Sequence, residues 1–95
     1  MNKTEYLLSC LIEESSEVIK ATTKSLRFGL NGTYCGSATN AQDIEKEYHE
    51  LVAIIEMLEA HGIITLSNRN IQIREKKEKL LLYMEHSKNL GTLIE

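Results

Sequence analysis

The chain has 95 residues, of which 42% are hydrophobic, and 14 acidic against 11 basic residues give a formal net charge of −3. This length suits one small domain over residues 1–95, and a nearly balanced charge does not favour a nucleic-acid polymer as a partner. No apolar run approaches the roughly 18–20 residues that cross a bilayer, and the absence of proline and tryptophan among many helix formers predicts an all-α fold.

The first predicted helix runs from about residue 3 to residue 28, beginning near Asn2 or Thr4. Its apolar face repeats at intervals of three and four residues, the period that keeps side chains on one side of a helix. The positions on this face are Leu7, Cys10, Leu11, Glu14, Glu17, Val18 and Ala21. Gly29 follows and suits the left-handed residue that ends many helices. Residues 30–39 are polar and rich in glycine, which predicts a loop.

The second predicted helix covers about residues 40–61, with Thr39 or Asn40 as its N-cap. Its inward face comprises Ile44, Glu47, Tyr48, Leu51, Ile54, Ile55 and Leu58. We expect Tyr48 to lie in the core as part of this face. The two cysteines are too few for a disulfide framework, so Cys10 and Cys35 are expected to be reduced thiols of a cytoplasmic protein.

The third predicted helix covers about residues 71–88 and is amphipathic, with Ile73, Leu80, Leu81 and Met84 expected on one side. Leu80, Leu81 and Leu82 are consecutive, and one helix face cannot bury all three. Three helices of these lengths therefore cannot bury all of their apolar side chains against one another. We expect a helical bundle of about three helices, two long antiparallel ones and a C-terminal one, completed by homo-oligomerisation as a dimer or tetramer.

The first two helices carry glutamates inside their apolar faces. Glu14 and Glu17 are three residues apart, as are Glu47 and Glu50, so each pair projects side by side. A buried carboxylate without a partner costs several kcal/mol or stays protonated. If the helices pack antiparallel, the four carboxylates converge and need a multivalent cation. An all-oxygen site favours Mg²⁺ first and Mn²⁺ second.

Three basic residues follow the acids on the first helix. Lys20, Lys24 and Arg27 are spaced by four and three residues and lie on or near the acidic side. An ordinary solvated basic face is the alternative. Acids that hold a metal, next to bases on the same side of a helix, suit a polyphosphate, because the metal and the cations then share its negative charge.

These motifs resemble a known family. Glu13-Glu14-x-x-Glu17, followed after a long spacer by Glu47-x-x-Glu50, is similar to the signature of the MazG-like all-α nucleoside triphosphate pyrophosphohydrolases. The run 24–30, Lys-Ser-Leu-Arg-Phe-Gly-Leu, and the pair Thr39-Asn40 look like the short versions that bacteriophages encode. The resemblance covers about residues 4–64, and the third helix carries no family motif.

The resemblance implies a reaction and a set of ligands. The family splits a nucleoside triphosphate into a monophosphate and pyrophosphate, and the matching positions imply Mg²⁺ bound by Glu14, Glu17, Glu47 and Glu50. Glu13 then orients a ligand lysine or water, and these five glutamates form the expected catalytic group. Lys20, Lys24 and Arg27 are the expected phosphate contacts, with Lys24 and Arg27 favoured because they lie in the phage-type run. The place of action implied is the cytoplasm of a bacterial cell.

One position departs from the family pattern, which usually has Asp where this chain has Glu50. The additional methylene moves the carboxylate by roughly 1 Å, and a misplacement of that order can cost on the order of 10²-fold in rate. Two alternatives therefore stand beside the enzyme: a non-catalytic protein that sequesters a nucleotide in the same pocket, and a helical interaction protein without a ligand. Phe28 and Tyr34 are candidates for stacking on a nucleobase, with core or interface packing as the alternative for each.

Overall fold

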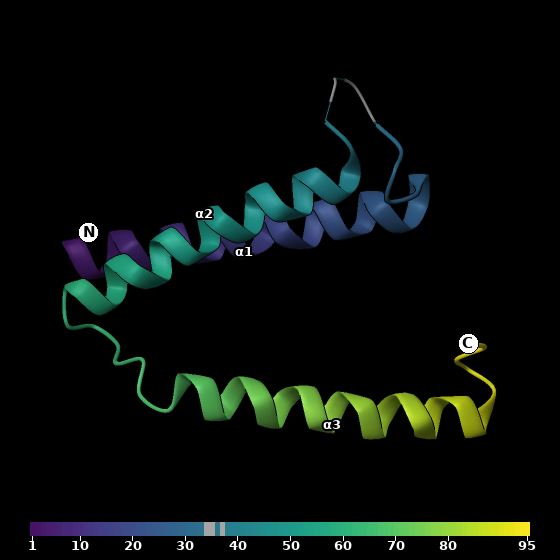
Figure 1. Ribbon diagram of the computed structural model, residues 1–95. Coiled ribbons are helices and arrows are strands. Elements are labelled where there is room, and N and C mark those ends of the chain that lie inside the picture. The colour runs from purple at the N-terminus through teal and green to yellow at the C-terminus, as the bar shows by residue number, and fades with distance from the viewer. Residues whose placement is uncertain (34–35, 37) are drawn as a thin grey trace. The chain divides into compact units, whose positions relative to one another are not determined.

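The structure, a computed structural model, describes residues 1–33, 36 and 38–95. It contains three helices, α1 (Lys3–Phe28), α2 (Asn40–Ala60) and α3 (Arg69–Leu90), and no strand among the described residues (Figure 1). The predicted all-α fold is confirmed. The chain divides into two compact units, Met1–Thr65 with α1 and α2, and Leu66–Glu95 with α3. Among the described residues no helix is both long enough and apolar enough to cross a membrane.

Side-chain caps set the starts of the first two helices. The Oδ1 of Asn2 accepts from the backbone N–H of Glu5 at 2.8 Å, so Asn2 is the N-cap of α1. At the start of α2, Thr39 Oγ1 accepts from the N–H of Gln42 at 3.1 Å, and Gln42 Oε1 accepts from the N–H of Thr39 at 2.9 Å. This reciprocal pair is a capping box, and it satisfies N–H groups that the first turn cannot pair internally.

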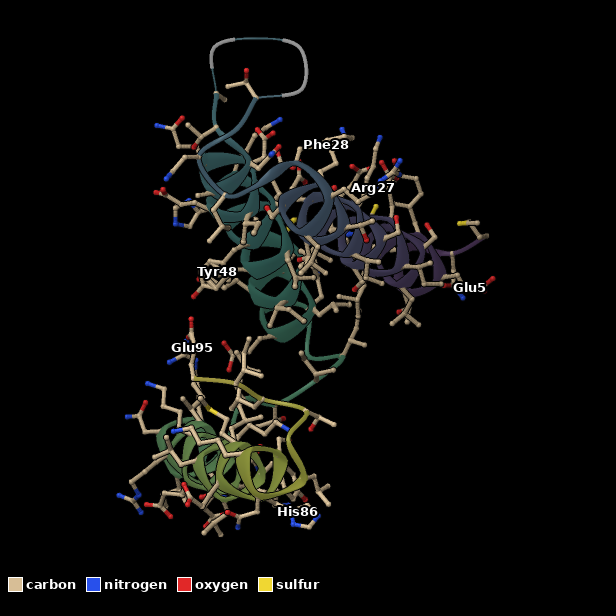
Figure 2. All side chains as sticks on the ribbon, turned by 90° about the vertical axis from the view of Figure 1, so that its right-hand side faces the viewer. Glu5, Arg27, Phe28, Tyr48, His86 and Glu95 are labelled. Atoms are coloured by element: carbon tan, nitrogen blue, oxygen red, sulfur yellow. The ribbon has the colours of Figure 1, made fainter. Side chains whose placement is uncertain are left out.

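Helices α1 and α2 lie side by side and run antiparallel, as Figure 1 shows in purple-blue and teal. The apolar side chains buried among the described residues are Leu7 and Ala21 of α1 and Leu58 of α2, and Leu58 is 0% exposed. All three belong to the predicted faces. The prediction for Tyr48 is wrong: its side chain is 49% exposed and projects from α2 away from α1 (Figure 2). It lies about 100° around the helix from Glu47, at the rim of the packed face.

A cluster of hydrogen bonds joins the end of α1 to the start of α2. The Nδ2 of Asn40, a residue only 1% exposed, donates to the carbonyl of Gly29 at 2.8 Å. The backbone N–H of Asn40 donates to the carbonyl of Gly32, and that of Ala41 to the carbonyl of Leu30, both at 2.9 Å. We call these three bonds the clasp. Gly29 ends α1 at the predicted position, and its φ of +88° favours glycine, but its ψ of 149° differs from the left-handed helical conformation that the sequence predicted.

The unit around α3 has no second helix in it. The apolar side chains of α3 are exposed, including Ile73 at 40%, Leu80 at 44% and Leu82 at 72%. A single helix cannot bury such side chains within its own unit, since burial needs a second packed surface. The helix ends at Gly91, whose φ of +80° and N–H bond to the carbonyl of Lys88 form a left-handed C-cap.

Of the two cysteines, Cys10 is a free thiol and half-buried on the packed side of α1, as expected for a reduced cysteine. Cys35 and Tyr34 lie outside the described residues, so the predictions made for them stay predictions.

Candidate metal centre

The antiparallel packing of α1 and α2 brings three of the predicted ligands together. One carboxylate oxygen from each of Glu14, Glu47 and Glu50 can be chosen such that all three lie within 4.8 Å of one another. Glu14 comes from the middle of α1, and the other two come from consecutive turns of α2. We call these three residues the acidic triad. Their meeting follows from the inward faces on which the sequence places Glu14 and Glu47.

Two oxygens of the acidic triad are buried without a partner. Glu14 and Glu47 are half-buried, and the side chain of Glu47 is only 13% exposed. The Oε2 atoms of both residues are shielded from solvent and have no hydrogen-bond partner among the described residues. Buried polar atoms are nearly always paired in folded proteins, so such orphaned oxygens call for a bound ion or water.

The electrostatics of the acidic triad are unfavourable without a cation. Burial raises the pKa of Glu14 above its usual 4.5, and the neighbouring carboxylates of Glu50, Glu13 and Glu17 raise it further, as does a hydrogen bond with Glu50. Burial also raises the pKa of Glu47, assisted by the hydrogen bond and the charge of Glu50. Lys46, whose Nζ lies 3.9 Å from Glu47 Oε1, acts in the opposite direction. Because Lys46 is largely exposed, it offsets this repulsion weakly.

Glu17, the fourth predicted ligand, does not join the acidic triad. It lines a pocket of about 140 Å³ between the two helices, together with Lys20, Ala21 and Lys24 of α1 and Asp43 and Glu47 of α2. We call this the lysine pocket. It places two predicted phosphate contacts, Lys20 and Lys24, beside Glu47 of the acidic triad. Glu47 therefore belongs to both the acidic triad and the lysine pocket.

Asp43, in the first turn of α2, is a residue of this region that the sequence analysis did not single out. It is half-buried and lines the lysine pocket. The signal that could have found it is its spacing, because Asp43, Glu47 and Glu50 follow one another at intervals of four and three on α2.

Two other predicted site residues lie apart from the acidic triad. Glu13 is exposed, and it acts on the site through its charge on Glu14. Arg27 is not among the residues that line the lysine pocket. Its guanidinium carbon lies 5.3 Å from the centre of the Phe28 ring, a cation–π distance, and Figure 2 shows both side chains at the end of α1.

A larger and more open hollow lies on the solvent side of α2. It measures about 480 Å³ and is lined by Ala38, Gln42, Asp43, Glu45, Lys46, His49 and Glu50. Glu50 is exposed at this hollow while its carboxylate also reaches Glu14 and Glu47. The acidic triad is therefore open to solvent on the Glu50 side.

The donor set fits a hard divalent cation. Three carboxylates supply oxygen ligands only, and Mg²⁺ commonly takes a few carboxylates and completes its shell with water or phosphate oxygens. The orphaned oxygens of Glu14 and Glu47 are positioned for such a bond. No protein-family model, curated protein or solved structure matches the chain. The resemblance to the MazG-like family thus rests on the motifs alone.

Proposed function

We propose that this protein is a Mg²⁺-dependent nucleotide pyrophosphohydrolase, which cleaves a nucleoside triphosphate or a related polyphosphorylated nucleotide to a monophosphate and pyrophosphate. The observation that carries the proposal is the juxtaposition of the acidic triad with the lysine pocket, joined through Glu47. Carboxylates with unpartnered oxygens attract a cation, and lysines beside them attract the phosphates that such a cation accompanies.

Glu14, Glu47 and Glu50 are the residues proposed to hold Mg²⁺, with Mn²⁺ as the second choice. When bound, the ion supplies positive charge that polarises a phosphoryl group and lowers the pKa of a water molecule. The raised pKa values of Glu14 and Glu47 agree with this role, because each carboxyl is destabilised as an anion until a cation arrives.

Lys20 and Lys24 are the proposed phosphate ligands. Both line the lysine pocket, and a lysine ammonium neutralises phosphate charge without demanding a fixed geometry. The volume of about 140 Å³ suits a phosphate group rather than a whole nucleotide. The nucleoside then extends beyond this pocket.

Glu17 is the proposed proton acceptor. In the reaction, a water oxygen bonds to phosphorus, the bridge between the α and β phosphates breaks, and the water loses a proton. Glu17 lies in the lysine pocket outside the acidic triad, so its carboxylate can accept that proton while the other three hold the ion.

The second candidate function is nucleotide sequestration without turnover. It is favoured by the same position of Glu17, since three converging carboxylates provide one ligand fewer than the motif implies. It is also favoured by Glu50, whose longer side chain replaces the aspartate usual in the family. Mg²⁺ tolerates imperfect geometry poorly, and catalysis suffers from it more than binding.

The test is incubation with a panel of nucleoside triphosphates and Mg²⁺, followed by detection of pyrophosphate. We expect turnover by the native chain, a loss of at least about 10²-fold in Glu14→Gln and Glu47→Gln, and none in the control Glu56→Gln, an exposed position on α2. Full activity in both site variants would refute the assignment. No turnover, but binding of nucleotide by calorimetry that needs Glu47, would favour sequestration.

A further inference from the structure

A second cavity lies on α2 beside the acidic triad and the lysine pocket. It measures about 480 Å³ and is lined mainly by side chains of α2 between Gln42 and Glu50, and we call it the α2 hollow. Small-molecule sites measure about 300–1,000 Å³, a range that includes the α2 hollow but not the lysine pocket of about 140 Å³. Residues 42–50 cover about 12 Å along the helix axis, so the α2 hollow is long enough for a nucleoside.

The α2 hollow adjoins both parts of the proposed site. Asp43 lines the α2 hollow and also the lysine pocket. Glu50 lines the α2 hollow and belongs to the acidic triad. If Mg²⁺ and the lysine pocket hold the phosphates of a nucleotide, its nucleoside can therefore enter the α2 hollow past Asp43 or Glu50.

The distribution of charge favours a different half of a nucleotide in each cavity. Three carboxylates line each cavity, and Mg²⁺ bound to the acidic triad neutralises one of them in each. Two carboxylates then face two lysines in the lysine pocket, but only one lysine in the α2 hollow. That lysine, Lys46, has a largely exposed side chain, so solvent screens its charge. Phosphate is therefore favoured in the lysine pocket, and an uncharged nucleoside in the α2 hollow.

His49 gives the α2 hollow a flat surface that suits a nucleobase. Its imidazole lies beside the ring of Tyr48, with the ring centroids 5.5 Å apart and the planes inclined at 53°. Aromatic pairs attract each other at this distance, so the contact favours one placement of the His49 ring. Histidine is one of the side chains on which nucleobases stack in proteins.

We infer that the α2 hollow is the subsite for the nucleoside half of the substrate and that the nucleobase stacks on His49. The inference rests on the proposed function, because it takes a nucleotide as the ligand. Asp43 and Glu45 line the same hollow, and ionised carboxylates accept hydrogen bonds, which suits the hydroxyl groups of the sugar. Stacking on a ring face tolerates every base, so purine and pyrimidine nucleotides should bind with modest differences.

The test compares ligands that have a nucleoside with one that lacks it. Binding is measured by calorimetry in Mg²⁺, with inorganic tripolyphosphate and with α,β-methylene analogues of the ribo- and deoxyribonucleoside triphosphates, which cannot be cleaved at that bridge. His49→Ala should weaken binding of the analogues about 5- to 10-fold, the low end for base stacking because His49 is exposed. Binding of tripolyphosphate should not change. His49→Phe should restore the affinity for the analogues, since it keeps a flat ring.

Two further variants separate the cavities from each other. Lys20→Ala, in the lysine pocket, should weaken the analogues and tripolyphosphate by similar factors. His61→Ala removes an exposed histidine that does not line the α2 hollow, and it should weaken neither kind of ligand.

Four results would overturn the inference. These are unchanged binding of the analogues in His49→Ala, equal weakening of the analogues and tripolyphosphate in that variant, no recovery in His49→Phe, and a native chain that binds none of the analogues. In the first three cases, pyrophosphate release that requires Glu14 would leave the proposed function standing. Conversely, binding that depends on His49 without any turnover would refute the pyrophosphohydrolase and keep the nucleoside subsite.

Discussion

Replacing Glu50 by glutamine should change the stability of the protein in opposite directions with and without Mg²⁺. Glu50 acts on both other members of the acidic triad, since its charge and its hydrogen bonds raise the pKa of Glu14 and of Glu47. In the metal-free protein the substitution removes a repulsive charge. An amide at this position can also donate a hydrogen bond to a neighbouring carboxylate. The metal-free Glu50→Gln variant should therefore be more stable than the native chain.

The size of this effect follows from the geometry of the Glu47–Glu50 pair. Their ligand oxygens lie within 4.8 Å of each other, and two unit charges at that separation repel by about 3 kcal/mol at an effective dielectric constant near 20. Glu50 is exposed, so solvent screening reduces the gain to about 1 kcal/mol. In a unit of 65 residues that gain raises the midpoint of thermal unfolding by about 4–8 °C.

Mg²⁺ should reverse the order of stability of the native chain and the Glu50→Gln variant. At a concentration of about 100 times the dissociation constant, a ligand stabilises the native chain by about 2.7 kcal/mol. If the loss of one carboxylate of three weakens binding about 100-fold, the same concentration stabilises the variant by only about 0.4 kcal/mol. The native chain then unfolds at the higher temperature, although it unfolds at the lower one in EDTA.

The measurement is thermal unfolding followed by circular dichroism, in EDTA and in a Mg²⁺ series, with Glu56→Gln as the control for removing one negative charge from α2. The control should show no reversal. A Glu50→Gln variant that is less stable than the native chain in EDTA would show that the acidic triad is not strained, and equal stabilisation of both proteins by Mg²⁺ would show that Glu50 is not a ligand.

Three further predictions concern the pH dependence, the core and the clasp. The pKa values of Glu14 and Glu47 are raised above 4.5 in the folded state, so their contribution to metal-free stability should be fully present below pH 4.5 and be lost as the pH rises through the raised values. Urea unfolding at a series of pH values should show this loss, and the Glu14→Gln/Glu47→Gln double variant should show a flatter profile. Leu58→Ala should cost about 2–5 kcal/mol in the same assay, because this side chain is 0% exposed; a cost under 1 kcal/mol would mean that α2 does not pack there. Gly32→Ala should cost about 1–3 kcal/mol and speed hydrogen exchange at the amide of Asn40, because a Cβ at residue 32 meets the carbonyl oxygen of the last residue of α1 at 2.5 Å; unchanged exchange would contradict it.

The limits of the helices could be predicted because they depend on neighbouring residues. The capping pair Thr39 and Gln42 and the stop at Gly29 act within one turn, and a linear sequence contains both partners of such contacts. The extent of α3 was underestimated by two residues at each end, since Asn68 provides no side-chain cap that would mark the start.

The site was harder to predict than the helices, because periodicity places a side chain only within a broad arc. Three residues turn α1 by about 300°, which leaves the side chains of Glu14 and Glu17 only about 60° apart, so both lie near the packed face. Once the register of the two helices is set, only Glu14 points at Glu47 and Glu50. That register depends on contacts between residues distant in sequence. The same limit explains why the prediction for Tyr48 was wrong. Its side chain is largely apolar, but its angular position on α2 puts it at the rim of the packed face, where it is exposed.

The clasp holds the end of α1 to the start of α2 independently of the residues that connect them. Its three hydrogen bonds tie residues 29, 30 and 32 to residues 40 and 41, so the chain is already closed at that point whatever sequence lies between. Substitutions or insertions between residues 32 and 39 can then alter what the protein presents at this end without sliding one helix along the other. The length and composition of the connection can therefore vary while the register of α1 against α2 stays the same.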